Sequence, residues 1–405
     1  MRFDLLHQYD KEKLYQLARA MWESVGIQGG VMFEQYFDSD LVKQPAFDIT
    51  IGGKQILSLN DRLIGLTITD NRGFEADTLE ITIDDTDGKI ELPPRGVEVS
   101  VAIGWLREPL VHKGIFTVDE ISHSGAPDQV VITARSADFR QDFNVKREYS
   151  WHDIKVGKVV SAIAGRYNLT PAVSKQLIDI EIDHADQTNE SDISFLSRMA
   201  EMLGAIATIK NGNLLFIIPN RGLTQGGTPI PEVIIKRDVG DRHSFRVADR
   251  DAYTGVKANW LDLNFGKKPA TSVKRKKKKT NAQKKEKKAK SSSKEGEYLE
   301  GAEGNVYVMR QTYKTEETAK RAAAAKWLKL QRGAAEFSIT LARGRADLYP
   351  EMPATVVGFK TVIDSHHWII SRVVHQIGDN GFQTQLELEL KIDNDNMVDG
   401  DNSTN

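Results

Sequence analysis

Two stretches of this chain alternate between apolar and polar residues, and this period of two constrains the fold more than any other feature. The alternation is clearest at residues 79–84 and 97–103 in the first stretch, and at 337–342 and 386–392 in the second. It places aliphatic side chains on one face of a β-strand and polar ones on the other. Turn signals separate the strands of the first stretch, with no helix between them. We therefore predict a small antiparallel barrel or sandwich there, and a return to strands in the second stretch.

Residues 150–235, between the two stretches, mix helical and strand patterns. A helical stripe of apolar residues runs over 156–167, and a second helix is predicted from an N-cap at Ser191 to Gly204. A hairpin follows at once, with Asn211-Gly212 in its turn. The pattern indicates a compact α/β unit.

Two further helices and a polar tail complete the expected elements. Residues 10–25 carry one apolar stripe, which packs on the protein's own body or docks on a partner. A helix is predicted over Glu316–Gln331, with Thr315 as its cap and Gly333 at its end. Residues 393–405 form a polar tail that we expect to fray.

The net charge of −2 conceals one strongly basic block. Residues 267–294 contain 14 Lys and Arg and one acid, a balance of +13, so the remaining chain carries −2 − 13 = −15. The block has no apolar periodicity and is predicted to be a disordered loop within the second strand stretch. It is either a solvated loop or a contact surface for DNA, an acidic partner or anionic lipid, although no aromatic residues interleave for base stacking. The possible contact residues are Lys274, Arg275, Lys276, Lys277, Lys278, Lys279, Lys284, Lys285, Lys287 and Lys288.

Composition excludes several classes of protein. Apolar residues make up 40% of the 405, enough for folded cores, and cysteine is absent, which excludes disulfides, cysteine-ligated metals and a thiol nucleophile. The longest apolar run, Leu214–Ile218, is too short to cross a bilayer, and we expect no membrane insertion. The charged start has no signal-peptide core. These features fit assembly in a reducing cytoplasm.

The sequence carries no known catalytic motif, and we predict no catalytic, cofactor-binding or metal-binding residues. The sequence contains no phosphate-binding loop, dinucleotide fingerprint, nucleophile elbow or zinc-protease motif. His366 and His367 are adjacent in a predicted strand and so point to opposite faces. His184 with Asp186 is interpreted as a hydrogen bond in a turn rather than a metal or base pair. Residues 84–88 are interpreted as a hairpin turn rather than a calcium loop.

Ordered motifs along residues 46–392 carry a family resemblance. They are LTITDNRGFEAD (66–77), LPPRG (92–96), GW (104–105), ARSADFR (134–140), SWHD (150–153), DQTNESD (186–192), GDRH (240–243), AYTGV (252–256), KWLKLQRG (326–333), GRAD (344–347) and GFK (358–360). The chain resembles phage late control protein D, the tail or baseplate hub of temperate contractile-tailed phages. That family is similar in turn to the hub-like part of type VI secretion spike proteins.

The resemblance implies two small antiparallel β-barrel domains flanking an α/β domain. It also implies a ring-shaped homotrimer with pseudo-sixfold symmetry, in which one face fits the hexameric tail tube and the other the trimeric spike. The domains expected on this basis are 1–45 (helical extension, extra to the family), 46–145 (first barrel), 146–235 (α/β), 236–392 (second barrel with helix 316–331 and the disordered insertion 267–297) and 393–405 (tail).

The implied function is structural and not enzymatic, with no cofactor. The implied partners are two further copies of the chain, the tail tube protein, the spike protein, the tape-measure protein and other baseplate proteins. DNA passes through the ring only in transit, and we expect an acidic or neutral channel wall that does not retain it. The implied location is the virion tail, with assembly in the host cytoplasm. The alternative is a nucleic-acid-binding or control protein acting through the basic block.

Overall fold

The computed structural model describes residues 43–55, 61–136, 141–210, 212–219, 222, 224, 228–247, 253–260, 270–274, 305–313 and 315–392. The predicted helix over residues 10–25 and the tail at 393–405 lie outside the described residues. Within the described part of the chain, no helix is long and apolar enough to cross a membrane.

Strands of the first region form an antiparallel sheet in the order β3-β4-β7-β6-β5-β1. The predicted alternation at residues 79–84 is confirmed, because Leu79, Ile81 and Ile83 are all buried in one apolar core. We call this set the first strand region. Its strands are β1 (Pro45–Ile51), β3 (Leu63–Asp70), β4 (Thr78–Asp84), β5 (Glu98–Trp105), β6 (Val111–Ser124) and β7 (Gln129–Ser136), and the short β2 (Lys54–Gln55) turns back on β1.

The second strand region repeats that order as β14-β18-β21-β20-β19-β13. Each pair of neighbouring strands runs in the same relative direction as the corresponding pair of the first region. The one exception is that β13 is parallel to β19, whereas β1 is antiparallel to β5. A separate apolar core lies under this region. Its strands are β13 (Val233–Lys236), β14 (Gly240–Val247), β18 (Ala335–Leu341), β19 (Pro353–Val357), β20 (His367–Gly378) and β21 (Gly381–Leu390), and helix α7 (Thr361–Asp364) follows β19.

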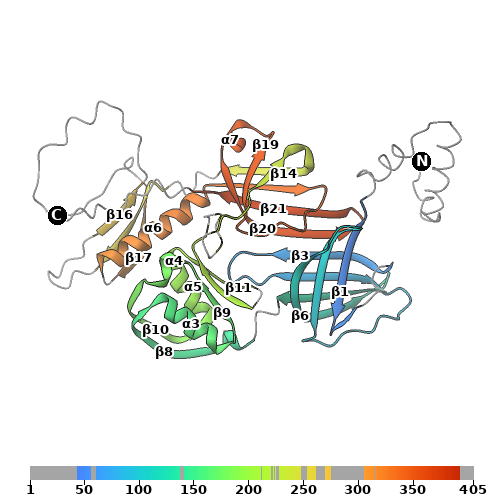
Figure 1. Ribbon diagram of the computed structural model, residues 1–405, viewed down its shortest axis with the longest axis horizontal. Helices are drawn as coiled ribbons and strands as arrows, with labels where there is room; N and C mark the ends of the chain where they lie inside the picture. The colour runs from blue at the N-terminus through green and yellow to red at the C-terminus, as the bar shows by residue number, and fades with distance from the viewer. Residues whose placement is uncertain are drawn as a thin grey trace, which may run out of the picture.

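The two regions join into one mostly antiparallel sheet of 13 strands (Figure 1). The joint is an antiparallel ladder between Gly65–Asp70 of β3 and Val373–Gly378 of β20. Backbone hydrogen bonds therefore run from one region into the other without interruption. The closure of each region into a barrel stays a prediction.

The middle unit packs helices against two small sheets and is strongly apolar inside. Helix α5 begins where predicted, with the Ser191 hydroxyl accepting from the Ser194 N–H, and it ends at Gly204 in the left-handed conformation (φ 66°). The predicted hairpin is confirmed, because β11 and β12 pair antiparallel up to Lys210 and Asn213; Asn211 of its turn lies outside the described residues. The elements are β8 (Lys146–Lys155), α3 (Val156–Arg166), β9 (Thr170–Val173), α4 (Lys175–Ile178), β10 (Glu181–Ser191), α5 (Asp192–Leu203), β11 (Ile206–Lys210) and β12 (Asn213–Ile217), after the 3-10 turn η2 (Gln141–Asn144).

A flanking unit consists of α6 (Glu316–Arg332) packed on the sheet of β15 (Gly255–Trp260), β16 (Ala270–Lys274) and β17 (Val306–Tyr313). The predicted helix and its Thr315 cap are confirmed, and the helix extends one residue further, to Arg332. In Figure 1, α6 runs between this sheet and the middle unit. Gly204 lies against α6, since a Cβ built on it would lie 2.9 Å from the Ala325 Cβ.

The predicted disordered insertion at 267–297 is wrong over its first part. Residues 270–274 form β16, which pairs antiparallel with Gly255–Asn259 of β15. The reason is that the sequence Ala-Thr-Ser-Val ahead of the lysines can join a strand ladder, because main-chain groups pair whatever the side chains are. The rest of the insertion, up to residue 297, lies outside the described residues.

Candidate functional site: a charged junction between the sheet and the middle unit

The basic residues singled out in the sequence give no defined surface. Lys274 is the last residue of β16. The other nine, from Arg275 to Lys288, lie outside the described residues. Their proposed contact role stays a prediction.

The structure corrects two interpretations of histidine. His366 is not in a strand: it follows α7, and its N–H donates to the Ile363 carbonyl, so β20 begins only at His367. His184 Nε2 lies 2.8 Å from Asp186 Oδ2 as expected, but within strand β10 rather than in a turn. The reason is that residues two apart in a strand share a face. Among the described residues, no group of three or more His, Asp or Glu side chains could hold a metal ion.

Residues 84–88 form a turn that is not a hairpin. The Gly88 N–H donates to the Asp85 carbonyl over 2.7 Å, which is the expected tight turn. However, β4 pairs with β3 and β7, and the strand after the turn, β5, pairs with β1 and β6. The turn residues could not reveal this, because they fix the local reversal and leave the partner of the next strand open.

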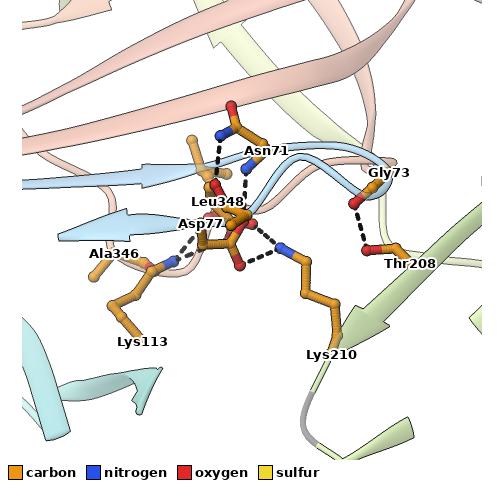
Figure 2. Close-up of polar contacts among 10 residues, drawn as sticks. Asn71, Gly73, Asp77, Lys113, Thr208, Lys210, Ala346 and Leu348 are labelled. Atoms are coloured by element: carbon orange, nitrogen blue, oxygen red, sulfur yellow. Dashed lines mark hydrogen bonds and ion pairs between the residues drawn. The ribbon is translucent and has the colours of Figure 1, made fainter. Parts of the chain in front are cut away.

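A cavity of about 430 Å³ lies where the two strand regions meet the middle unit. Its wall combines apolar side chains, including Ile206, Ile217 and Phe116, with the charged groups of Asp70, Asp77, Lys113 and Lys210. These side chains come from β3, the β3–β4 connection, β6, β11 and β12. Figure 2 shows that the polar groups converge on the end of β3 and the connection after it.

The β3–β4 connection is held in shape by its own polar groups. Asp77 Oδ1 accepts from the Asn71 N–H over 2.8 Å, and the Asn71 side chain donates to the Ala76 carbonyl over 3.0 Å. Gly73 at the tip has φ 80°, a left-handed conformation that favours glycine. The connection therefore presents one Asp77 carboxylate oxygen and the Gly73 carbonyl to the middle unit.

Two side chains of β11 bind this connection from the middle unit. Lys210 Nζ lies 2.5 Å from both Asp70 Oδ1 and Asp77 Oδ2, and the Thr208 hydroxyl donates to the Gly73 carbonyl over 2.5 Å (Figure 2). Two carboxylates share this one ammonium group, and the pKa values of Asp77 and Lys210 are both shifted. Burial, with the nearby charge of Asp70, raises the pKa of Asp77 to about 6. Burial opposes the charge of Lys210, but Asp70 and Asp77 outweigh it and raise the pKa of Lys210.

Lys113 of β6 reaches across the cavity floor to the second strand region. Its Nζ donates to the Ala346 and Leu348 carbonyls, each over 3.3 Å, and lies 3.9 Å from Asp70 Oδ2. The side chain is only 7% exposed, and burial lowers the pKa of Lys113. This lysine thus connects the first strand region to the segment before β19.

A second buried ion network lies beside the sheet joint. Arg72 Nε lies 2.6 Å from Glu351 Oε1, and Arg72 Nη1 lies 2.5 Å from Glu389 Oε1. Arg332, the last residue of α6, approaches the same Glu389 carboxylate at 3.6 Å. Although burial opposes its charge, the two glutamates raise the pKa of Arg72. One guanidinium therefore connects the β3–β4 connection, the second strand region and, through Glu389, the flanking unit.

This arrangement of charges positions parts of the chain relative to each other. Each of the cations Lys113, Lys210 and Arg72 contacts acceptors from another part of the sequence. The motif LTITDNRGFEAD was visible in the sequence, but its role was missed. The available signal was a run of charged residues at 70–77, including Asp70, Arg72 and Asp77, at the junction of two apolar strands.

Comparisons with known proteins identify the family that the chain is similar to. A family model described as phage tail baseplate hub (GPD) matches residues 77–381. A probable baseplate hub protein of Escherichia phage 186 is 49% identical over 363 residues, which cover 86% of this chain and 93% of the relative. The corresponding protein of Escherichia phage P2 is 47% identical over 379 residues, with 88% and 96% covered.

A solved structure agrees in fold. The 43 kDa tail protein of prophage MuSo2 from Shewanella oneidensis superposes with a TM-score of 0.60 at 13% identity, covering 87% of this chain and 99% of that chain.

Proposed function

The chain belongs to the phage tail baseplate hub family, and from that premise we propose that three copies form a ring that adapts the hexameric tail tube to a trimeric spike. The family is one of structural proteins of contractile tails and not of enzymes, and its members are part of the virion tail. The ring, its symmetry and its axial channel are our proposals.

The observation that carries the adaptor proposal is the repeated strand order within one sheet. One chain presents two strand regions of the same order, joined side by side through β3 and β20. Three chains then present six similar units, which matches sixfold symmetry on one face. The middle and flanking units occur once per chain, so they keep threefold symmetry. A closed ring of this kind requires a head-to-tail contact between copies.

The charged junction supports the same proposal, because an adaptor needs fixed geometry between its two kinds of surface. Lys210 fixes the middle unit to Asp70 and Asp77 on the sheet, and Arg72 fixes the sheet to Glu351 and Glu389. Each of these contacts links elements that are distant in sequence. The subunit is therefore a suitable rigid connector between tube and spike.

The proposed channel conducts DNA without retaining it. Outside the basic block the chain carries −15, so three copies carry about −45, and like charges repel the DNA backbone. We propose that the basic block lies outside the channel. The proposed partners are the tail tube, spike, tape-measure and other baseplate proteins, and assembly takes place in the host cytoplasm.

Co-expression of the full chain with the spike protein of its own phage tests the adaptor proposal. Mass photometry should give three copies of the chain per complex, and electron microscopy should show a threefold ring with an axial opening. A chain that remains monomeric beside a folded spike trimer would contradict the proposal.

Deletion of residues 275–296 separates this reading from a nucleic-acid-binding function. The deletion spares β16 and should leave the trimer intact, since residues 275–296 contribute to none of the described elements. A nucleic-acid-binding or control protein that acts through the basic block should bind DNA with a steep salt dependence and lose that binding on deletion.

A further inference from the structure

Strands β3 and β6 of the first strand region can be matched residue by residue to β14 and β20 of the second, because two β-bulges fall at the same places in both regions. The β3–β4 ladder shifts register between Leu63 and Gly65, and the β14–β18 ladder shifts between Gly240 and Arg242. Each shift adds one residue at the start of the strand. A β-bulge is a fixed feature of a sheet, so it can serve as a marker for matching strands.

A second pair of bulges matches the other strands. The ladder of β6 with β7 shifts register between Val118 and Glu120, and that of β20 with β21 shifts between Ile370 and Arg372. The extra residue is Asp119 in β6, and it corresponds to Ser371 in β20. Counting from these bulges, Ser124 corresponds to Gln376.

The sheet joint is formed by one edge of β3 and one edge of β20. β3 pairs with β4 along one edge and with β20 along the other. β20 accepts β3 only over Val373–Gly378, beyond the point at which its pairing with β19 ends at Ile369. The second half of β20 is thus the docking edge within the chain.

The corresponding edges elsewhere are open in the described part of the chain. β14, the counterpart of β3, pairs with β18 along one edge and with no described strand along the other. β6, the counterpart of β20, pairs with β5 only as far as Thr117, and no described strand takes that edge over residues 119–124. Figure 1 places β14 and β6 in different parts of the molecule, so one copy cannot join them.

We propose that β14 of one copy pairs antiparallel with residues 121–124 of β6 in the next copy, which repeats between chains the joint that β3 and β20 make within a chain. The inference rests on the proposed ring and specifies the contact that closes it. Such an interface is head-to-tail, as a closed ring requires. It also covers two strand edges that would otherwise invite unspecific pairing.

The internal joint predicts the register of this contact. Thr67 faces Gln376 within the chain, and their counterparts are Ser244 and Ser124. Ser244 of one copy should therefore face Ser124 of the next. By the same count, Val247 should face Ile121, and Arg246 should face Ser122.

The side chains on the two edges are complementary in this register. Val247 is 59% exposed, and in this register it faces Ile121 of the next copy, which packs against the core of the first strand region. On the other face, Arg246 lies diagonal to Glu120, within the reach of long side chains.

Paired cysteines test the register directly, because the chain contains no cysteine of its own. The test variant is Ser124→Cys with Ser244→Cys, assembled with the spike protein and then oxidised. Directly opposed residues in an antiparallel pair have Cα atoms about 4.5–5.5 Å apart, which a disulfide can bridge. We expect most chains to run as two-chain and three-chain species on a non-reducing gel, and as single chains after reduction.

Two matched variants calibrate the result. Ser122→Cys with Ser244→Cys moves one cysteine by two residues on the same face, to a diagonal spacing of about 7–8 Å, and should link poorly. Thr67→Cys with Gln376→Cys places the two cysteines opposite each other in the sheet joint of a single chain. They should form a disulfide within each chain, which shows that oxidation was effective. Mass photometry of the reduced samples reports assembly separately.

The outcomes separate this inference from the ring proposal. Trimers in which Thr67→Cys/Gln376→Cys closes but Ser124→Cys/Ser244→Cys does not link chains would overturn the strand pairing and leave the ring standing. Trimers in which the offset variant links best would overturn the register. Monomers in every sample would overturn the ring, and with it this contact.

Discussion

The sheet joint and the junction with the middle unit use different chemistry. At the sheet joint, β3 and β20 pair through their backbones along Gly65–Asp70, and Arg72 and Lys113 add buried polar contacts beside it. At the junction with the middle unit, the side chains of Thr208 and Lys210 make the contact next to a cavity of about 430 Å³. The ladder spreads the contact over six residues of each strand, whereas the junction depends on a few side chains of β11. The comparison indicates that the two strand regions behave as one body on which the middle unit is mounted.

The largest effect is expected at the sheet joint from Arg72→Met. The variant leaves Glu351 and Glu389 buried without their main cation, and removing one partner of a buried ion pair costs about 3–5 kcal/mol. Urea unfolding should show this loss of stability. Hydrogen exchange should rise in β3 and β20 together, since they share the joint.

Arg62→Met is the matched control for that prediction. Arg62 makes a bidentate contact with Asp87, with both nitrogen–oxygen distances at 2.6 Å, but the pair lies at the surface. Surface ion pairs contribute little to stability, because solvent screens them, so the loss from Arg62→Met should be small. Equal losses from Arg62→Met and Arg72→Met would contradict the importance given to the buried network.

The next effect concerns the middle-unit junction and depends on pH. Because the pKa of Asp77 is raised to about 6 in the folded state, that state binds more protons than the unfolded chain between roughly pH 4 and 6. Asp77 therefore lowers stability as pH rises through this window, by up to about 3 kcal/mol. Asp77→Asn keeps the acceptor for the Asn71 N–H and should gain stability relative to the parent as pH rises from 4 to 7.

Asp87→Asn should show the opposite dependence of stability on pH. The hydrogen bond from Arg62 lowers the pKa of Asp87, so its contribution is present above the unfolded pKa and is lost on acidification. The difference between parent and Asp87→Asn should shrink as pH falls below about 4. A pH-independent difference for Asp77→Asn would show that its carboxyl titrates normally and that the junction imposes no electrostatic penalty.

The smallest effect tests the contact of the middle unit with α6. Gly204→Ala places a Cβ 2.9 Å from the Ala325 Cβ at a φ of 66° and should cost about 2 kcal/mol. Gly212→Ala has a similar φ of 72° with open space around it, so it should cost only about 1 kcal/mol. Thermal unfolding measures both. Equal losses of stability from the two variants would mean that the contact between Gly204 and α6 can shift without cost.

The local elements could be predicted from the sequence, and their partners could not. The alternation around Ile81, the cap at Ser191 and the end at Gly204 are all signals carried by a few neighbouring residues, and the structure confirms them. The pairing of β3 with β20 joins segments about 300 residues apart, and no periodicity encodes such a choice. The same limit hid the junction, because Asp70, Asp77 and Lys210 meet only after the middle unit has docked.

The distance in sequence between β3 and β20 has a consequence during synthesis. At about 5–20 residues per second, the ribosome takes about 15–60 s to add the roughly 300 residues that separate them. The first strand region can complete its own ladder from β1 to β7 in that time, but the free edge of β3 waits for the last strands to emerge. A nascent hub chain thus exposes an open sheet edge for most of its translation, and crowded polysomes are where it is most at risk of pairing with the wrong neighbour.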